Sequence, residues 1–515
     1  MIWYKPGLST QLAITATCFS AFLLFGYDQG VFGGLITNEN FLATFKNPST
    51  SFLSIIVSIY NIGCLIGAFI NVFVGEWSGR RKAIWAAMFL IALGAVLQCS
   101  AFNVGQLMLG RVITGIGVGI DTSTVPMYQS ELCKPHVRGR LVTTEVLFTG
   151  LGVTIAYFFV FGMSYAGGAL AWRLPISMQI PPCFIIAILV KGLPESPRWL
   201  VQKGRIQEAV QILAHVFNAE ESDETVQSEK NAMIDAVALE RSNPFRWTNV
   251  FRPDSVRTGY RIFLACLVLF MNQASFDSIQ WAGINVIVFY APTVLETNVG
   301  LPHSTALITS GFLNLAFTVG SLIPAFKLDT WGRKKPMMGG AFGAAISMMI
   351  VAILLSFQGT PHEKTLANVS IAFFVTFMLC FGASLNAIPW CYSAEILPLH
   401  VRAQGTSIAV MVNWICVFII VMTTPTMVAN IAWKTYLVFM VMNFIFVPII
   451  YIVFPETAGL TLEQIDYIFV KRGDSEVVEA VGSSPALSQT AEKETVNGGK
   501  YPGTDEAPES KHIEK

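Results

Sequence analysis

The stretch Glu76-Trp77-Ser78-Gly79-Arg80-Arg81 returns 253 residues later as Asp329-Thr330-Trp331-Gly332-Arg333-Lys334. Two further motifs recur in the same order and at nearly the same offset. Pro126, Glu131 and Arg138 return as Pro389, Glu395 and Arg402, and Pro194-Glu195-Ser196 returns as Pro455-Glu456-Thr457. Three motifs in one order at nearly one offset are hard to obtain by chance. The chain is therefore predicted to consist of two halves that repeat each other.

The composition indicates a membrane protein. Of the 515 residues, 53% are hydrophobic and 13% are charged, whereas soluble domains usually carry about 25% charged residues. So little polar surface argues against a soluble enzyme. The 33 basic and 33 acidic residues balance, so no positive excess indicates a nucleic-acid partner. The nine cysteines include no Cys-x-x-Cys, so neither a disulfide framework nor a metal site is predicted, and no cofactor is expected.

Twelve apolar stretches are long enough to cross a bilayer, which takes about 20 residues of helix. Short loops at 75–83, 129–140, 328–336 and 393–403 carry ten Lys and Arg residues, and the loops between them on the other side carry four. The positive-inside rule places the first set of loops, and both termini, in the cytoplasm. The predicted spans are 12–36, 52–74, 83–101, 104–128, 141–163, 174–192, 261–291, 304–327, 336–356, 367–392, 404–425 and 432–454.

The chain divides into four predicted parts. Residues 1–192 and 259–470 form six-helix halves, which makes the fold class an all-α membrane protein with twelve transmembrane helices. Residues 193–258 form a cytoplasmic linker with amphipathic helices, because Ile206, Val210, Leu213 and Phe217 recur at helical spacing. Residues 471–515, rich in Gly, Ser, Glu, Pro and Lys, are predicted to be a disordered cytoplasmic tail.

At these motifs the sequence resembles the sugar porter family of the major facilitator superfamily, over roughly residues 12–470, and it is most similar to fungal members. The narrower marks of that family are Pro126-Met-Tyr-Gln-Ser-Glu131, Pro194-Glu-Ser-Pro-Arg198, Gly283-Ile-Asn285 and Pro455-Glu-Thr-Ala-Gly459-Leu. The resemblance implies the major facilitator fold and a site between the halves at the membrane midplane.

The same resemblance implies transmembrane transport of a monosaccharide, a hexose or a pentose, by alternating access and coupled to proton symport. It implies a monomer in the plasma membrane, with a small sugar, protons and the lipid bilayer as partners and no enzymatic activity. Three alternatives remain open: an uncoupled sugar facilitator, a disaccharide transporter and a transport-inactive sugar sensor.

The charged residues of the repeated motifs are expected at cytoplasmic helix ends. The resemblance implies that they form ion pairs that tie the halves together when the outside is open. An Arg–carboxylate pair is strong where water is partly excluded and weak once hydrated, so such a set can act as a latch. Charge that merely keeps loops in the cytoplasm would not explain matched acids at fixed spacing. The predicted gating residues are Arg80, Arg81, Glu131, Arg138, Glu195, Arg198, Asp329, Arg333, Glu395, Arg402 and Glu456.

Five ionisable residues lie well inside the predicted spans: Asp28, Arg111, Asp121, Glu145 and Asp277. Each costs at least ~2.5 kcal/mol to insert, which makes each a functional candidate. Asp28 and Arg111 match positions that pair in proton-coupled family members, where separation of the pair favours the protonated acid. The alternative is a permanent ion pair between two helices. The predicted spans contain four acids and only one base, so one or two of the acids should be neutral or open to water. Asp121, Glu145 and Asp277 have no assigned role.

A sugar site needs neutral amides for the hydroxyl groups and an aromatic ring for the apolar face of the sugar. Taken singly, such residues can instead be helix–helix contacts or interface anchors. Val146 and Ile279 stand where the family usually has glutamine, so the substrate need not be glucose, and a pentose, a disaccharide or another polyol-like solute stays open. The residues that match family sugar contacts are Phe25, Gln280, Asn285, Asn314, Trp390, Asn413 and Trp414.

Overall fold

The computed structural model describes residues 2–133, 138–242, 257–274, 284–357, 359–398, 401–458, 460, 465 and 468–469. Throughout these ranges the regular structure is helical. The first half contains α1 (Leu8–Leu35), α2 (Glu39–Thr44), α3 (Thr50–Ser78), α4 (Arg80–Cys99), α5 (Val104–Leu132), α6 (Arg138–Ser164), α7 (Leu170–Ser177) and α8 (Ile180–Gly192). The second half contains α12 (Thr258–Ala274), α13 (Ile284–Val294), the π-helix η3 (Leu295–Val299), α14 (His303–Trp331), α15 (Lys334–Leu355), α16 (Glu363–Gly382), α17 (Ile388–Glu395), α18 (Arg402–Ile431) and α19 (Lys434–Val453).

The helices account for all twelve predicted spans. Ten spans in the described ranges are long and apolar enough to cross a membrane. The fourth predicted span, α5, is not among these ten, although it is 29 residues long. Its mean hydropathy is lower because it contains Arg111, Asp121 and many glycines and threonines. The seventh is divided between α12 and α13, with residues 275–283 outside the described part. The all-helical membrane fold is therefore confirmed.

Two spans differ from the uninterrupted helices that the sequence predicts. The sixth begins at Leu170 and is broken between α7 and α8, where Pro181 and Pro182 open the new helix. The tenth is broken after Gly382 and resumes at α17, with Pro389 in its first turn. Proline has no N–H to donate, so it suits the first turn of a helix and not its interior.

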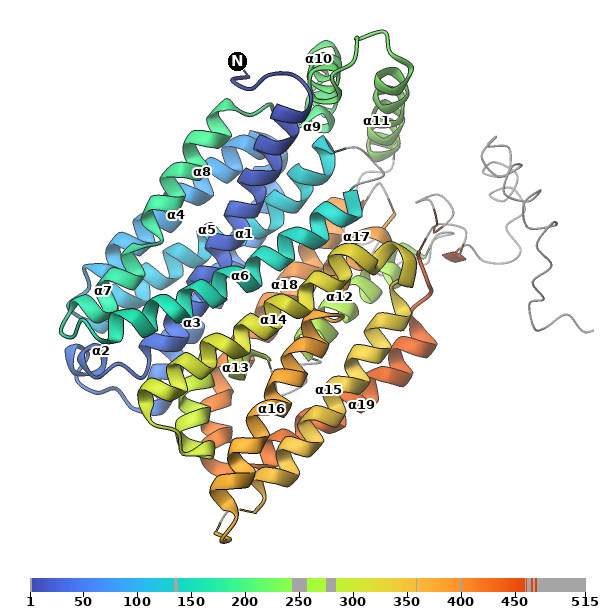
Figure 1. Cartoon of the computed structure of the whole chain (residues 1–515). Coiled ribbons are helices and arrows are strands. Elements are labelled where there is room, and N and C mark those ends of the chain that lie inside the picture. The colour runs from blue at the N-terminus through green and yellow to red at the C-terminus, as the bar shows by residue number, and fades with distance from the viewer. Residues whose placement is uncertain are drawn as a thin grey trace, which may run out of the picture.

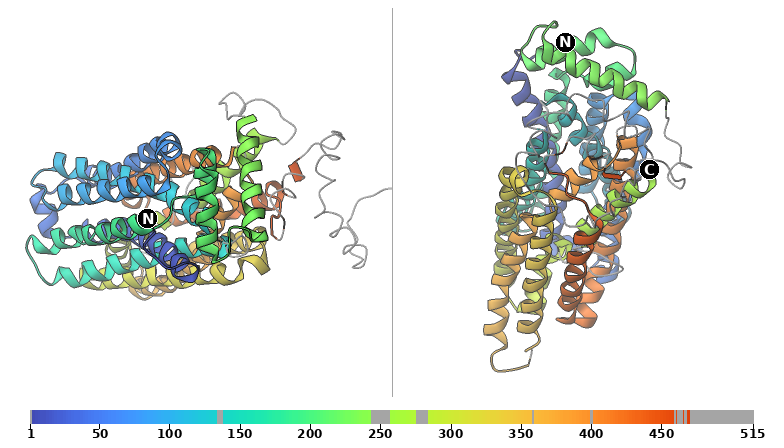
Figure 2. Two further views of the ribbon diagram at one scale, coloured as in Figure 1. Left: turned by 90° about the horizontal axis from the view of Figure 1, so that it is seen from above. Right: turned by 90° about the vertical axis from the view of Figure 1, so that its right-hand side faces the viewer.

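The two halves lie side by side, and Figure 1 shows that the axes of their long helices are roughly parallel. They meet where α6 packs on α14 and α3 packs on α18. Three helices of the segment between the halves, α9 (Pro197–Gln202), α10 (Ile206–Phe217) and α11 (Glu224–Ser242), lie beside the N-terminus at one end of the molecule (Figures 1 and 2). We call this the motif end, because the repeated charged motifs lie there, and the end that carries α2 the opposite end.

The N-terminal segment is fastened to α10. The Gly7 N–H donates to the His215 carbonyl at 2.8 Å, and Gln11 Nε2 donates to the Val216 carbonyl at 2.7 Å. Val210 and Leu213 on the apolar face of α10 are buried, whereas Ile206 at its first turn is 40% exposed. These contacts couple the first residues of α1 to the helices of the motif end.

Helices α1 and α6 cross with almost no side chain between them. A Cβ added at Gly26 would collide with the Thr149 carbonyl, and one added at Gly152 would collide with the Leu23 carbonyl. Only glycine permits so close an approach. This contact fixes the position of Asp28, two residues beyond Gly26.

Candidate functional site

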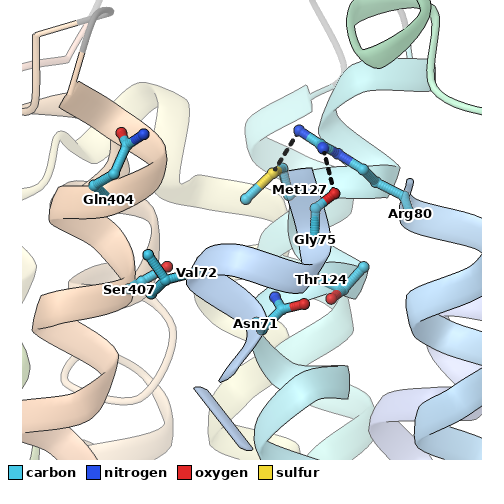
Figure 3. A pocket seen from close by; sticks show the side chains of 8 residues that line it. All are labelled: Asn71, Val72, Gly75, Arg80, Thr124, Met127, Gln404 and Ser407. Carbon is cyan, nitrogen blue, oxygen red and sulfur yellow. Dashed lines mark hydrogen bonds between the residues drawn. The ribbon is translucent and has the colours of Figure 1, made fainter. Parts of the chain in front are cut away.

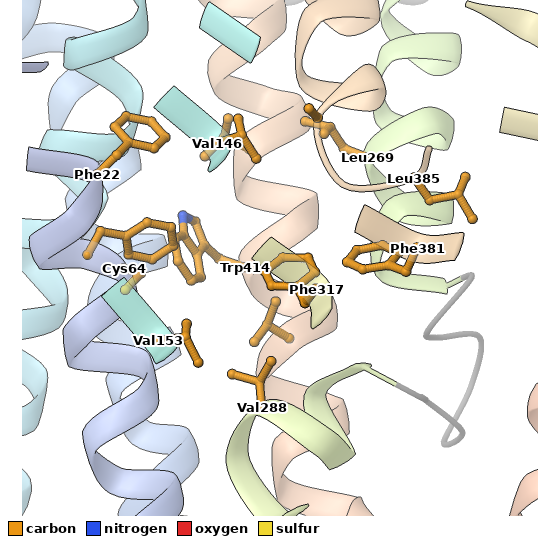
Figure 4. Close-up of a cluster of buried hydrophobic side chains, with 14 of the residues drawn as sticks. Phe22, Cys64, Val146, Val153, Leu269, Val288, Phe317, Phe381, Leu385 and Trp414 are labelled. Atoms are coloured by element: carbon orange, nitrogen blue, oxygen red, sulfur yellow. The ribbon is translucent and has the colours of Figure 1, made fainter. Parts of the chain in front are cut away.

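The centre of the molecule holds an aromatic contact between the halves. Trp414 on α18 is 1% exposed. Its ring meets Phe25 of α1 edge to face, with 5.8 Å between ring centroids, and Tyr60 of α3 at 6.4 Å. Figure 4 shows Trp414 between Phe22 and Cys64 of the first half and Phe317 of the second. The structure thus brings together two residues that the sequence assigns to the sugar site, Phe25 and Trp414.

Beside Trp414 lies a group of amides that sequence reasoning only partly identified. The predicted residue Asn413 accepts a hydrogen bond from Gln273 Nε2 at 2.9 Å. The neighbouring Asn272 donates to the carbonyls of Leu385 and Asn386, where the tenth span is broken. Gln273 and Asn272 were missed, although two adjacent amides at the end of the apolar helix α12 were a signal that could have identified them.

Two buried side chains, Asn314 and Trp414, each carry a polar atom without a hydrogen-bond partner in the described part of the chain. Asn314 on α14 is fully buried, and its Nδ2 donates to the Ser310 carbonyl of its own helix at 2.9 Å. Its Oδ1, like Trp414 Nε1, has no hydrogen-bond partner within the described ranges. Within the described part of the chain, one acceptor and one donor are therefore available to the hydroxyl groups of a solute.

The remaining predicted sugar contacts are placed less completely. Trp390 lies half-buried on α17. Asn285 belongs to the first turn of α13, but its side chain is outside the described part, as is the whole of Gln280. Their contact with a solute stays a prediction. Val146, which replaces the family's glutamine, is 6% exposed and lies among the central side chains (Figure 4).

Asp28 and Arg111 meet inside the first half, as the sequence predicts. Arg111 Nη1 lies 3.9 Å from Asp28 Oδ1, and the two side chains are 1% and 0% exposed. The guanidinium carbon is 3.9 Å from the Phe32 ring centroid and 4.6 Å from that of Tyr60. Arg111 Nη2 donates to the Val57 carbonyl at 2.8 Å rather than to Asp28. The ion pair is therefore dry, enclosed by aromatic rings and not closed by a short hydrogen bond.

The other intramembrane acids do not join this pair. Asp121 and Glu145 are buried, and they are electrostatic neighbours of each other. Asp121 lies ten residues beyond Arg111 on α5 and does not share its face, as the helical spacing predicts. Asp277 lies outside the described residues.

At the motif end, two predicted gating pairs form with the same geometry in each half. Arg80 donates to Glu131 from Nε at 3.2 Å and from Nη2 at 3.1 Å. Arg333 donates to Glu395 from Nε at 3.2 Å and from Nη2 at 2.9 Å. Each pair joins helices of one half, in a conformation whose halves are in contact at the opposite end, so the expectation of pairs between the halves when the outside is open stays a prediction. In this conformation both pairs stabilise the halves themselves.

The third motif of the repeat caps the helix that begins at the first motif, which is α4 in the first half and α15 in the second. Glu195 accepts from the N–H groups of Arg80 and Ser196, both at 3.0 Å, and Glu456 accepts from the N–H of Arg333 at 2.8 Å. A carboxylate at a helix N-terminus is favoured by the helix dipole. Burial nevertheless raises the pKa of Glu195 above its ordinary value, against the lowering effect of these donors. Gly79 and Gly332, at φ of 87° and 80°, make the turn that allows this contact.

The other predicted gating residues bind backbone carbonyls, lie near an acid of the first motif pair or fall outside the described part of the chain. Arg81 donates to the Lys191 carbonyl at 2.6 Å, and Arg402 donates to the Leu397 carbonyl at 3.2 Å. Arg198 lies within electrostatic range of Glu131. The side chains of Arg138 and Asp329 are outside the described part, so their roles stay predictions.

A small cavity with several polar side chains in its lining opens between the halves on the motif side of the centre (Figure 3). It spans α3 and α5 of the first half and α18 of the second. Toward the opposite end the halves are in contact instead. Tyr157 Oη donates to the Val288 carbonyl at 2.7 Å, and the Thr154 and Thr318 hydroxyls are 3.1 Å apart. The cavity is lined by Asn71, Val72, Gly75, Arg80, Thr124, Met127, Gln404 and Ser407.

Comparison with known proteins agrees with this architecture. Residues 13–469 match the family model described as "Sugar (and other) transporter". The sugar transporter STL1 of Saccharomyces cerevisiae is 34% identical over 91% of this chain and 83% of its own length. The MFS-type transporter oryC of Aspergillus oryzae is 34% identical over 94% of this chain and 87% of its own length.

A similar fold occurs in a solved structure. The proton:xylose symporter XylE, bound to 6-bromo-6-deoxy-D-glucose, superposes with a TM-score of 0.78 at 24% identity, covering 90% of this chain and 99% of that one. Together with the family match over nearly the whole chain, the helical repeat and the central site identify the chain as a multi-pass membrane transporter. It belongs to the sugar (and other) transporter family, the sugar porters of the major facilitator superfamily.

Proposed function

We propose that this transporter carries a monosaccharide across the membrane by alternating access and moves a proton in the same direction. The observation that carries the proposal is the Phe25–Trp414 contact between the halves, together with the Gln273–Asn413 hydrogen bond and the buried Asn314. An aromatic face beside neutral amides suits a ring of hydroxyl groups. The site takes residues from both halves, so relative movement of the halves would expose it to either side.

Named relatives support this substrate class. A high-affinity glucose transporter of Candida albicans is 28% identical over 91% of this chain, and the structurally similar XylE is a proton:xylose symporter. The choice between hexose and pentose depends on the residues around Trp414. Val146 offers no hydrogen bond where an amide would, so we expect weaker selection among hydroxyl patterns on that side.

The Asp28–Arg111 pair is proposed to hold the coupled proton. Both side chains are buried and lack a short hydrogen bond to each other. Ionised Asp28 is stabilised chiefly by the nearby guanidinium, so withdrawal of Arg111 would favour its protonation. A packing change of α1 against α5 could therefore bind or release a proton while the halves move.

The proposal also covers the orientation of the chain in the membrane and its division into parts. We propose that the motif end and both termini are cytoplasmic, that the membrane is the plasma membrane and that a monomer transports. The basic loops of the motif end support this orientation. We propose residues 1–192 and 259–470 as the two transporting halves and 193–258 as the cytoplasmic linker, whereas the tail predicted at 471–515 lies outside the described residues.

Uptake in cells that lack their own sugar transporters tests the proposal. We expect at least one labelled hexose or pentose to accumulate above the external concentration, and a protonophore to abolish that accumulation. Equilibration without accumulation would identify an uncoupled facilitator. Uptake of disaccharides alone would contradict the substrate class, and sugar binding without any uptake would identify a sensor.

A further inference from the structure

We propose that Asn272 and Gln273, adjacent amides at the end of α12, join the sugar contact Asn413 to the break in the tenth span. Sugar binding then steadies the backbone turn at 383–387, between α16 and α17. Asn272 is a positioning residue in this arrangement, because the turn sets the place of Trp390 in the first turn of α17. The response to sugar rests on the proposed function, whereas the hold of Asn272 on the turn does not.

The break in the tenth span leaves a carbonyl group that its own helix cannot satisfy. In an α-helix the carbonyl of Leu385 would accept from the N–H of residue 389, but that residue is Pro389 and has no N–H. Leu385 is 1% exposed, and Figure 4 shows it among the central hydrophobic side chains. A carbonyl without a donor is costly where neither water nor lipid supplies one. The turn therefore depends on a donor from another helix.

Asn272 supplies this donor from α12. Its Nδ2 donates to the Leu385 carbonyl at 2.5 Å and to the Asn386 carbonyl at 3.1 Å. Asn272 is 3% exposed, and α12 packs against both α17 and α18. From the turn itself, Asn386 Nδ2 donates to Ser321 Oγ of α14 at 3.0 Å. Two amides thus hold the turn between α12 and α14.

The first half shows that the proline alone does not break the helix. Pro126 corresponds to Pro389 in the repeat, yet it lies inside the continuous helix α5. The break in the second half therefore depends on the side chains that surround Pro389. Asn272 is the one among them that donates to both carbonyls of the turn.

The second amide of α12 extends this contact to the sugar site. Gln273 Nε2 donates to Asn272 Oδ1 at 3.2 Å and to Asn413 Oδ1 at 2.9 Å. The Asn413 oxygen is thereby turned toward Gln273, and the N–H groups of Asn413 are left as donors for a sugar oxygen. A sugar that binds Asn413 favours this arrangement of amides, and through Gln273 and Asn272 it favours the turn as well.

Hydrogen–deuterium exchange on the purified full-length protein measures the hold on the turn without sugar. In Asn272→Leu, which donates nothing, the backbone N–H groups at 383–390 should exchange at least about fivefold faster, the equivalent of one lost hydrogen bond. Asn443→Leu is the matched control and should leave this exchange unchanged. Asn443 is also buried, but it lies on α19 and donates to a carbonyl of its own helix.

Gln273→Leu separates the turn from the sugar site. It keeps both bonds from Asn272 to the turn, so exchange at 383–390 without sugar should stay near the wild-type rate. The probe is the hexose or pentose that the wild type takes up fastest. This sugar should slow exchange at 383–390 in the wild type but not in Gln273→Leu. In uptake, Gln273→Leu combined with Asn413→Leu should raise KM by less than the product of the single effects, because both break one contact.

Two results would overturn the proposal. Unchanged exchange at 383–390 in Asn272→Leu would show that the turn does not need Asn272. Exchange that the sugar leaves unchanged in the wild type, or slows equally in Gln273→Leu, would show that the amides do not join the turn to the site. A wild type that takes up no sugar would instead contradict the proposed function. The comparison of Asn272→Leu with Asn443→Leu would still decide the hold on the turn.

Discussion

At the scale of single residues, the central site consists of side chains that contact across helices or across the halves. Phe25, Asn314, Asn413 and Trp414 could be predicted from their residue types and from the family resemblance. The partner of Asn413 could not, because which amide of α12 reaches α18 depends on how the helices are rotated about their axes.

Asn413→Leu should lower the affinity for sugar about tenfold, because one desolvated hydroxyl loses its partner at a cost of ~1–3 kcal/mol. Competition uptake at several sugar concentrations measures the effect as a higher KM. Asn443→Leu is the matched control. Asn443 is equally buried, but it lies on α19 and donates to the Phe439 carbonyl of its own helix. Equal losses in the two variants would indicate general damage rather than a sugar contact.

At the scale of helices, the repeat in the sequence becomes a repeat of contacts. Tyr128 Oη donates to the Pro194 carbonyl at 2.6 Å, and Tyr392 Oη donates to the Pro455 carbonyl at 2.7 Å. The sequence predicted the spans themselves because twenty apolar residues leave few alternatives in a bilayer. It did not predict the breaks within the sixth and tenth spans, where prolines and neighbouring helices decide the backbone together.

The crossing of α1 and α6 can be tested with two glycines of the same helix. Gly152→Ala should lower the stability by about 1–3 kcal/mol, because its methyl group would enter the backbone of α1. Gly162→Ala is the control, since a Cβ there meets nothing within 4 Å. Alanine favours a helix, so this variant should be neutral or slightly more stable. Thermal unfolding in detergent measures both, and equal Tm values would contradict the close crossing.

The ion pairs of the motif end are expected to stabilise each half. Arg333→Ala leaves Glu395, 19% exposed, without its guanidinium partner, and the loss of one partner of a largely buried pair costs about 3–5 kcal/mol. Thermal unfolding should show a clearly lower Tm. Lys335→Ala, which removes an exposed charge two residues away, should leave Tm nearly unchanged. Equal changes in Tm for the two variants would show that Arg333 contributes only positive charge to the loop and not a stabilising ion pair.

At the scale of the whole molecule, the halves are in contact toward the opposite end, and a small cavity lies between them on the motif side. The arrangement corresponds to one conformation of an alternating-access cycle. Within the described ranges few hydrogen bonds join the halves, so each has a measurable share in the balance between conformations.

Tyr157→Phe should shift that balance toward opening at the opposite end. The lost hydrogen bond to Val288 is worth ~1 kcal/mol, about a fivefold change in population. Spin labels at the exposed positions Ala166 and His362, one in each half, should report a larger share of long distances. Tyr128→Phe removes a similar bond within one half and should leave the distribution unchanged. The same distribution in all three proteins would show that Tyr157 does not hold the halves together.

The central claim is that a proton on Asp28 is coupled to sugar movement through Trp414 and its neighbouring amides. Asp28→Asn tests it most directly, because the amide keeps the shape of the neutral acid but cannot bind or release a proton. In proteoliposomes with an imposed pH gradient, the variant should lose accumulation against a sugar gradient and retain exchange of labelled for unlabelled sugar. Accumulation that survives in Asp28→Asn at the wild-type level would contradict the claim.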